Sequence, residues 1–465
     1  MARRYLVVSD LHLCDVEDHA DGWKAYKAAR FVFDRELAAE VDRFVHEGPP
    51  DDERILVLNG DIVDFDLVTV APDDPPWPVS AAERRRGMDP TEDKSEWKLR
   101  RVLDDHPQFV DMLARVLAAG HRIVYVLGNH DRELHFGAVR QALVSAVLAH
   151  ARAAGLSIDP ARLSFEPWFF HVPGELYAEH GQQYDYYNSF RYLLEPTVPG
   201  RSGPMLSLPM GNLSNRELMS EMGFFNPHAS DYILNVYRYV AHWLRYYAFS
   251  RHSLAVRWLL GSMVVMMQLL RNKQALARTP PDHERNLEQL AQRVSLPLST
   301  VKALDALKRQ PITNRWYRVL REFWIDRIVV ASLLAGGTLV LALSPAPLWA
   351  KLMLPLSSFP LLFAIYEWFA HGETVFSAER EASRYARAIA DLVSVPVVTF
   401  GHSHDPVVVP LRAGATYVNT GTWAPVWGRD DQQQLRPGLR NVLHVRCEDG
   451  QTQLSLRSCM PAPHE

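Results

Sequence analysis

Four short apolar runs, each ending at small or acidic residues, constrain the fold of this chain more than any other feature. They are Tyr5–Ser9, Ile55–Asn59, Ile123–Leu127 and Pro396–Phe400. Two stretches of helical periodicity, about 23–46 and 96–119, separate the first three runs. This alternation predicts an α/β fold, in which the loops at the carboxyl ends of the strands carry the functional residues.

From about residue 191 to residue 388 the alternation stops, and the chain becomes aromatic, apolar and helical in pattern. We interpret 191–388 as a helical insertion within one catalytic domain, with 1–190 as the first part of that domain and 389–465 as the second. Strand patterns return after the insertion and predict an antiparallel end to the fold. They are Val395–Gly401, Thr416–Asn419, Asn441–Cys447 and Gln453–Leu456.

Composition and charge exclude some classes of function. The formal net charge is −4 with 22% charged residues, and no long basic tract indicates nucleic acid. The three cysteines form no CxxC pair, which favours a reducing compartment. The N-terminus passes directly into the first apolar run without a stretch long enough for a secretory signal, so we expect the catalytic part to be cytoplasmic.

Five short blocks of carboxylate, amide and imidazole residues stand at the ends of predicted strands. They are Asp10-Leu11-His12, Gly60-Asp61-Ile62-Val63-Asp64, Gly128-Asn129-His130-Asp131, Glu179-His180-Gly181 and Gly401-His402-Ser403-His404. Each block alone is a weak signal. Five of them in this order, each after an apolar strand, indicate one functional site.

The residue types in these blocks indicate divalent cations. Carboxylates combined with neutral imidazoles suit manganese, iron or zinc, whereas an all-oxygen set would favour magnesium or calcium. Two cations roughly 3.5 to 4 Å apart repel each other and need an anionic ligand between them. A single bridging aspartate can supply that ligand.

In this order the blocks resemble the calcineurin-like metallophosphoesterase superfamily, whose signature is DxH, GDxxD, GNHD/E, H and GHxH. The resemblance covers roughly residues 4–190 and 390–425 and leaves the insertion unexplained. It implies the family's four-layer αββα sandwich of two sheets flanked by helices, here with the large helical insertion as a cap. It also implies two divalent metal ions, with manganese expected first and iron or zinc as alternatives.

The resemblance implies a role for each residue of the blocks. One ion would be held by Asp10, His12 and His404, the second by Asn129, His180 and His402, and Asp61 would bridge the two ions. His130 would stabilise the phosphoryl transition state or protonate the leaving oxygen, and Asp131 would orient its ring. We expect Asp64 to hydrogen-bond to a ligand rather than to bind a metal. Four residues near ligands in the sequence could touch substrate or be solvated: His19, His135, Asp185 and Asp405.

The implied reaction is hydrolysis of a phosphoester or pyrophosphate bond, with a metal-bridged hydroxide attacking phosphorus in line. The substrate would be a phosphorylated small molecule or a lipid-linked molecule. One alternative is a membrane-associated pyrophosphatase of a lipid-linked nucleotide, because the helical insertion is similar in general plan to the lipid-A-pathway pyrophosphatases of this superfamily. Those enzymes tend to carry arginine where this chain has His130, which argues against that substrate. The other alternative is a catalytically silent metal-binding scaffold.

Within the insertion, residues 328–366 have the pattern of an apolar helical hairpin. Ile328–Ser344 and Leu352–Tyr366 contain no charged residue, and the intervening segment contains two prolines. Arginines precede the first run and aromatic residues flank both runs, as they do at membrane interfaces. The alternatives are a membrane hairpin or interfacial anchor, which would attach the protein to the inner face of the membrane, and a hairpin buried against other helices.

A second segment of the insertion, Asn286–Lys302, has the pattern of a helix-turn-helix. Because few basic residues surround it, we do not expect nucleic acid as a partner. A structural pair of helices is the expected form of this segment.

Overall fold

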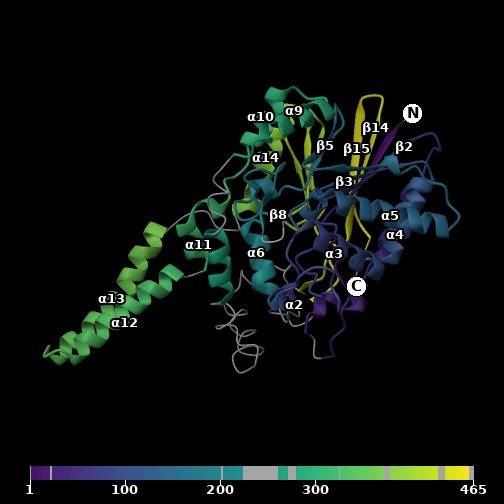
Figure 1. Cartoon of the computed structure of the whole chain (residues 1–465). Helices are drawn as coiled ribbons and strands as arrows, with labels where there is room; N and C mark the ends of the chain where they lie inside the picture. The colour runs from purple at the N-terminus through teal and green to yellow at the C-terminus, as the bar shows by residue number, and fades with distance from the viewer. Residues whose placement is uncertain are drawn as a thin grey trace, which may run out of the picture.

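The computed structural model describes residues 2–20, 23–200, 203–221, 223, 260–270, 279–323, 325–370, 377–427 and 435–459. The described chain forms two stacked sheets with helices on their outer faces (Figure 1). A further pair of helices extends away from this body. The predicted four-layer αββα sandwich is confirmed.

The first sheet has six strands in the order β15-β14-β1-β2-β3-β4. Strands β1 to β4 are parallel neighbours, and β14 and β15 complete the sheet in antiparallel pairing, as predicted for the end of the chain. Their bounds are β1 (Arg3–Val8), β2 (Glu53–Asn59), β3 (Arg122–Val126), β4 (Leu163–Glu166), β14 (Asn441–Glu448) and β15 (Gln451–Ser458).

The second sheet has five strands in the order β10-β11-β9-β6-β5. Strand β9 is parallel to both β6 and β11, while β5 and β10 pair in antiparallel fashion at the two edges. Their bounds are β5 (Phe169–Val172), β6 (Leu176–Glu179), β9 (Val397–Phe400), β10 (Val407–Pro410) and β11 (Thr416–Asn419).

Alternate residues of the first sheet face two different cores. On β1, Leu6 and Val8 belong to the core beneath the outer helices, whereas Tyr5 and Val7 pack between the two sheets. The first outer layer consists of α1 (Asp34–His46), α3 (Glu92–Asp105), α4 (Pro107–Ala118) and α5 (Gly137–Ala153). Because these strands are buried on both faces, they appear in the sequence as continuous apolar runs rather than as alternating ones.

The second outer layer comes from the segment predicted as an insertion. It consists of α9 (His283–Arg293), α10 (Leu298–Ala306) and α14 (Ser377–Val393), which share one core with the second sheet. The helix-turn-helix pattern is thus a structural pair, in which Leu287, Leu290 and Val301 are buried. The domain boundaries at 190 and 388 stay a prediction, and residue 388 lies inside α14. The segment between them supplies an outer layer of the sandwich in addition to any cap.

Shorter elements connect these layers. Four of them are helices: α2 (Glu83–Arg86), α6 (Met210–Glu217), Leu260–Leu270 and α11 (Trp316–Glu322). Two are small two-stranded sheets, β7 (Thr197–Pro199) with β8 (Pro204–Leu206) and β12 (Val426–Trp427) with β13 (Leu435–Arg436).

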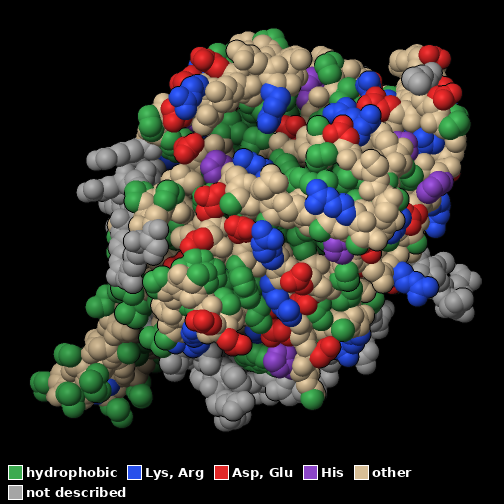
Figure 2. Space-filling model, turned by 45° about the vertical axis from the view of Figure 1, so that its right-hand side comes forward, with side chains coloured by type: hydrophobic (Ala, Val, Ile, Leu, Met, Phe, Trp, Pro, Cys, Tyr) green, Lys and Arg blue, Asp and Glu red, His purple; other side chains and the backbone are tan. Residues whose placement is uncertain are grey.

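The predicted apolar hairpin extends away from the sandwich as α12 (Ile325–Leu343) and α13 (Leu348–Ala370) (Figure 1). Figure 2 shows this arm with hydrophobic side chains over most of its visible surface. Ile325–Leu343 and Leu348–Tyr366 are each 19 residues long and apolar enough to cross a membrane, with 0% and 6% of their residues buried. The alternative of a hairpin buried against other helices is therefore wrong for the described chain.

Candidate metal centre

The predicted ligands meet where parallel strands of the two sheets end. Asp10 and His12 follow β1, Asp61 follows β2, and Asn129 follows β3 in the first sheet. His180 follows β6, and His402 and His404 follow β9 in the second sheet. The carboxyl ends of neighbouring parallel strands meet at one edge, so side chains far apart in the sequence converge there.

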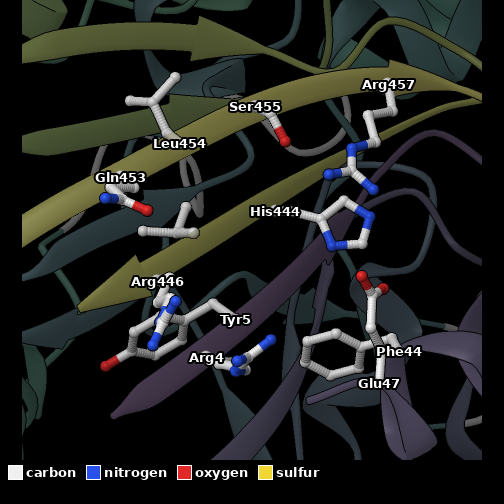
Figure 3. Close-up of a pocket in the computed structure, with 11 residues that line it drawn as sticks. Arg4, Tyr5, Phe44, Glu47, His444, Arg446, Gln453, Leu454, Ser455 and Arg457 are labelled. Atoms are coloured by element: carbon white, nitrogen blue, oxygen red, sulfur yellow. The ribbon is translucent and has the colours of Figure 1, made fainter. Parts of the chain in front are cut away.

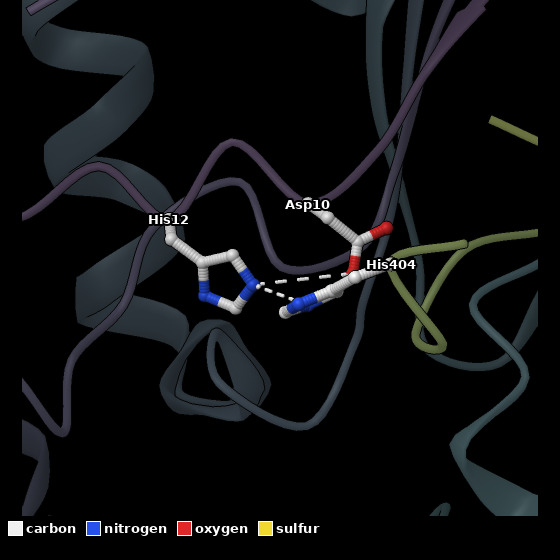
Figure 4. Close-up of side chains that lie close together, drawn as sticks. All are labelled: Asp10, His12 and His404. Carbon is white, nitrogen blue, oxygen red and sulfur yellow. Dashed lines mark hydrogen bonds and ion pairs between the residues drawn. The ribbon is translucent and has the colours of Figure 1, made fainter. Parts of the chain in front are cut away.

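Asp10, His12 and His404 form the first group of possible metal ligands, and Figure 4 shows their side chains pointing toward one another. His12 Nε2 lies 3.0 Å from His404 Nε2, and Asp10 Oδ1 lies 3.2 Å from His404 Nε2. Two nitrogen ligands about 2.1 Å from one ion and at right angles to each other would be roughly 3 Å apart. The spacing fits three ligands around one cation.

Asp61, His180 and His402 form a second group. Asp61 Oδ2 lies 2.8 Å from His180 Nε2, and Asp10 Oδ1 of the first group lies 4.0 Å from the same nitrogen. Asp61 also belongs to a group with His12, so its carboxylate lies between the two sets. This is the position in which a bridging carboxylate would lie.

Asn129 provides an independent sign of a cation. Its Oδ1 atom is buried and accepts no hydrogen bond from the part of the chain that the structure describes. Leaving a buried acceptor unpaired costs about 1–3 kcal/mol, a cost that a bound cation would remove. The donor set of carboxylate, imidazole and amide atoms thus fits a divalent ion.

Asn212 of α6 sets the orientation of the Asn129 amide. Its Oδ1 accepts a hydrogen bond from Asn129 Nδ2 at 3.2 Å, and its Nδ2 donates to the Asn129 carbonyl at 3.0 Å. With Nδ2 held in this way, Oδ1 remains for a metal. Asn212 lies 83 residues from Asn129 in a segment without a motif, and no sequence signal identifies it.

Five of the predicted ligands have an unusual backbone conformation. Ten non-glycine residues of the described chain have positive φ, and five of these are Asp10, His12, Asp61, His402 and His404. Each left-handed residue of this kind costs on the order of 1 kcal/mol or more, and such strain concentrates at functional sites. Backbone hydrogen bonds between the loops after β1 and β2 hold the conformation, including Asp10 N to Gly60 O and His12 N to Asp61 O.

Two glycines of the blocks make room for ligand carboxylates. A Cβ atom on Gly128 would collide with the Asp61 carboxylate, and one on Gly401 would collide with the Asp10 carboxylate. These glycines are needed because a ligand passes against the backbone, not because they form turns with positive φ.

The Asp64 carboxylate lies behind His12, one of the predicted ligands, and also belongs to a group of possible ligands with Asp66 and His130. Its Oδ2 atom is 3.0 Å from His12 Nδ1, the ring nitrogen that does not face the first group. A carboxylate behind a histidine fixes the tautomer and the ring orientation, which leaves Nε2 for the metal.

The expectation that Asp131 orients the His130 ring is wrong. The Asp131 carboxylate accepts hydrogen bonds from the Tyr125 hydroxyl and from the backbone of Ile62 and Gly128, and so holds together the loops after β2 and β3. Adjacent residues of the loop point in different directions, and the carboxylate turns into the core. His130 Nδ1 instead lies 3.2 Å from Asp64 Oδ2 and 3.3 Å from Asp66 Oδ2.

The buried charges of the site are arranged in a pattern that suits cations. Burial raises the pKa of Asp61, but His180 and His130 more than compensate, and the pKa lies well below its ordinary value. Burial lowers the pKa of His130, but Asp64 and Asp61 raise it well above its ordinary value. The carboxylates thus make the electrostatic potential at the site negative, which favours bound cations.

Four polar residues near ligands in the sequence are possible substrate contacts: His19, His135, Asp185 and Asp405. Of these, Asp185 contacts a predicted ligand. Its Oδ2 atom lies 3.1 Å from His402 Nε2, which leaves Nδ1 of that ring for a metal. His19 pairs with Glu17 at 3.0 Å, and its side chain is 38% exposed. Asp405 is exposed and His135 is partly buried.

A cavity of about 290 Å³ lies elsewhere, over β1, β14 and β15 (Figure 3). Arg4, His444, Arg446 and Arg457 line it. Arg4 pairs with Asp52, Arg446 with Glu448 and His444 with Glu40. Because most of these cationic groups already have acidic partners, the cavity does not have the charge of a phosphate site.

Groups of carboxylate and imidazole side chains at the carboxyl ends of the strands of an αββα sandwich suit a metal-dependent hydrolase. The family model for calcineurin-like phosphoesterases matches residues 3–250, which is more than half of the chain. The chain belongs to the calcineurin-like phosphoesterase family, and it is a metallophosphoesterase that uses divalent metal ions. No curated protein matches the chain. The family match ends before His402 and His404, and the fold brings these two residues to the site.

Proposed function

We propose that the protein hydrolyses phosphoester or pyrophosphate bonds with two divalent ions, of which manganese is the metal we expect. The observation that carries this proposal is the position of Asp61, which belongs to one group of possible ligands with His180 and His402 and to another with His12. His12 in turn belongs to the group of Asp10 and His404. Asp10, His12 and His404 would hold one ion. Asn129, His180 and His402 would hold the other.

When bound, two such ions lower the pKa of a shared water molecule and polarise the phosphoryl oxygens. The chain's own residues supply the remaining chemistry. Asp64 and Asp66 both face Nδ1 of His130, and we propose that the other ring nitrogen, Nε2, acts on the substrate. There it would donate a proton to the leaving oxygen or stabilise the charge on the phosphoryl group.

A catalytically silent scaffold is the alternative from another class. A purely structural metal site has no use for a histidine held between two carboxylates beside the ligands. His130 is 9% exposed, whereas His180 is fully buried. This arrangement favours the enzyme.

Metal removal tests the proposal. We expect the manganese-loaded protein to hydrolyse an aryl phosphate monoester or diester, to lose this activity after chelation, and to regain it when manganese is restored. Iron and zinc are compared in the same experiment to rank the metals. A protein that binds two ions per chain but hydrolyses neither ester would contradict a general phosphoesterase.

We also propose that the α12–α13 hairpin enters a lipid bilayer and attaches the protein to the inner face of the membrane. A helix of 19 residues is roughly 29 Å long, close to the hydrocarbon thickness of about 30 Å. Trp349 near the tip is 66% exposed and Trp368 near the base is 78% exposed, as expected for residues at the two interfaces. Such a hairpin favours a membrane-held substrate, for example a lipid-linked nucleotide.

Vesicle flotation tests the hairpin. We expect the wild-type protein to float with vesicles, and a variant in which a Gly/Ser linker replaces 325–370 to stay in the dense fraction. The linker variant should retain its metal ions and its activity on soluble esters, because the hairpin packs outside the sandwich. A wild-type protein that does not bind vesicles would refute membrane attachment.

A further inference from the structure

The Leu260–Leu270 helix has an exposed face that is entirely apolar. Leu260, Met263, Met267 and Leu270 recur at helical spacing and are 58%, 52%, 45% and 58% exposed. The opposite face is buried, with Ser262 and Val265 at 0% exposure. The solvent face of a helix on a soluble protein normally carries charged residues, but this helix contains none.

The buried face of this helix packs against α6. Gln268 Nε2 donates a hydrogen bond to Glu217 Oε1 at 2.9 Å, and a Cβ atom on Gly261 would collide with Leu218. Helix α6 also carries Asn212, which contacts Asn129 at the metal centre. Five residues separate Asn212 from Glu217, or about 8 Å along a helix, so the apolar face lies within two helix widths of the site.

The same helix lies in one hydrophobic core with the base of the hairpin. Val265 belongs to the cluster that includes Val319 and Phe323 of the segment leading into α12. That segment is joined to the site as well: Ile312 N donates to the Tyr186 carbonyl at 2.9 Å, next to the Asp185 that holds His402. The base of the hairpin and the apolar helix are thus each linked to the metal centre through one intervening segment.

We propose that the apolar face of the Leu260–Leu270 helix is a second membrane contact, which lies on the surface of the bilayer that the hairpin enters. The described part of this helix, 11 residues or roughly 16 Å, is shorter than the hydrocarbon core and suits the headgroup boundary. We take the bilayer as the occupant because Val265, on the buried face of this helix, shares a hydrophobic core with Val319 and Phe323 at the base of the hairpin. The hairpin itself is apolar and almost entirely exposed.

This contact names the substrate class for the proposed hydrolase, and in that respect it rests on the proposed function. With the Leu260–Leu270 helix on the bilayer surface, α6 lies one helix layer above it, and the metal centre lies within two helix widths of the headgroups. The substrate is therefore a phosphate ester or anhydride carried by a molecule whose apolar part stays in the membrane.

A depth measurement tests the contact without using activity. Spin labels are attached to Met263→Cys and Met267→Cys in full-length protein with the Cys459→Ser background, since Cys14 and Cys447 are buried. The control is Val408→Cys on β10, an apolar residue at the edge of the second sheet that is 46% exposed. Oxygen concentrates in the bilayer, whereas a water-soluble nickel complex stays in water. In anionic vesicles we expect the labels at 263 and 267 to collide more often with oxygen than with the nickel complex. We expect the control label to collide more often with the nickel complex.

Two results of the depth measurement would overturn the contact. Labels at 263 and 267 could remain as accessible to the nickel complex as the control label. They could also be shielded only as protein concentration rises, which would identify a second copy of the chain as the occupant. Either result assigns the face to something other than the bilayer.

Activity provides a separate test of the substrate class. The double variant Met263→Glu/Met267→Glu is compared with Val408→Glu. We expect the double variant to lose roughly tenfold in hydrolysis of a phosphate ester embedded in vesicles, because charged side chains are costly at the interface. Bound metal and hydrolysis of a soluble aryl ester should not change.

The two proposals fail in different ways. If the wild-type protein hydrolyses neither substrate, the proposed function is wrong while the depth measurement still decides the membrane contact. If the double variant acts on the vesicle substrate as well as the wild type does, or loses both substrates equally, the substrate class inferred here is wrong.

Discussion

Replacing Asp61 with alanine is expected to remove both metal ions and to abolish hydrolysis. Its carboxylate is 1% exposed and belongs to possible ligand groups on both sides. Each pair of unit charges 4 Å apart repels by about 4 kcal/mol near a protein surface, and divalent ions multiply this figure. Without the bridging anion the ions should not remain together. Elemental analysis of metal per chain, together with aryl ester hydrolysis, measures both effects.

Two control variants sharpen this experiment. Asp61→Asn keeps the size of the side chain and removes its charge, so it separates electrostatics from shape. Asp52→Asn removes a similarly buried carboxylate that pairs with Arg4 far from the site, and it should keep both ions. If Asp61→Ala retained two ions per chain and full activity, Asp61 could not be the bridging ligand.

Replacing His130 with alanine is expected to keep the metal ions and to reduce turnover by roughly 10²- to 10⁴-fold, the usual contribution of a general acid or base. The structure places His130 close enough to His12 and Asp61 to be counted among possible ligands. It also turns Nδ1 of the ring toward Asp64 and Asp66. Metal content therefore decides between the two roles, and loss of an ion from His130→Ala would make it a ligand.

The identity of the leaving group distinguishes the two ways in which His130 could act. If it protonates the leaving oxygen, the variant should lose much more activity on an alkyl ester than on an aryl ester whose leaving group needs no proton. If it stabilises charge on the phosphoryl group, the two losses should be similar. Asp66→Asn is a useful companion, because it removes one carboxylate that faces the ring. Asp66 Oδ2 also accepts a hydrogen bond from Asn212 Nδ2, so metal content is measured in this variant as well.

The αββα sandwich and the residues of the metal centre could be predicted because strands buried on both faces have a recognisable composition. Their carboxyl ends converge, so motifs that follow apolar runs must meet in space. Asp10, Asp61 and His404 were placed in this way, and the structure brings them into adjoining groups.

Residue contacts within the loops could not be predicted in this way. The adjacency of His130 and Asp131 in the sequence suggested a pair, but consecutive side chains of a loop diverge, and Asp131 instead joins the loops after β2 and β3. Asp66 has no motif of its own, and Asn212 comes from α6 in the predicted insertion. The left-handed conformations of five ligands also depend on hydrogen bonds between separate loops.

The sequence by itself determined the chemistry of this protein. It shows which carboxylates and imidazoles are available, which strands they follow, and that two helices are apolar enough for a bilayer. The tertiary structure decided the rest. It placed α9, α10 and α14 over the second sheet, left the α12–α13 hairpin exposed, and joined Asn212 to Asn129. The physical reason is that composition and periodicity report whether a side chain prefers burial, whereas the identity of its neighbour depends on contacts between distant parts of the chain.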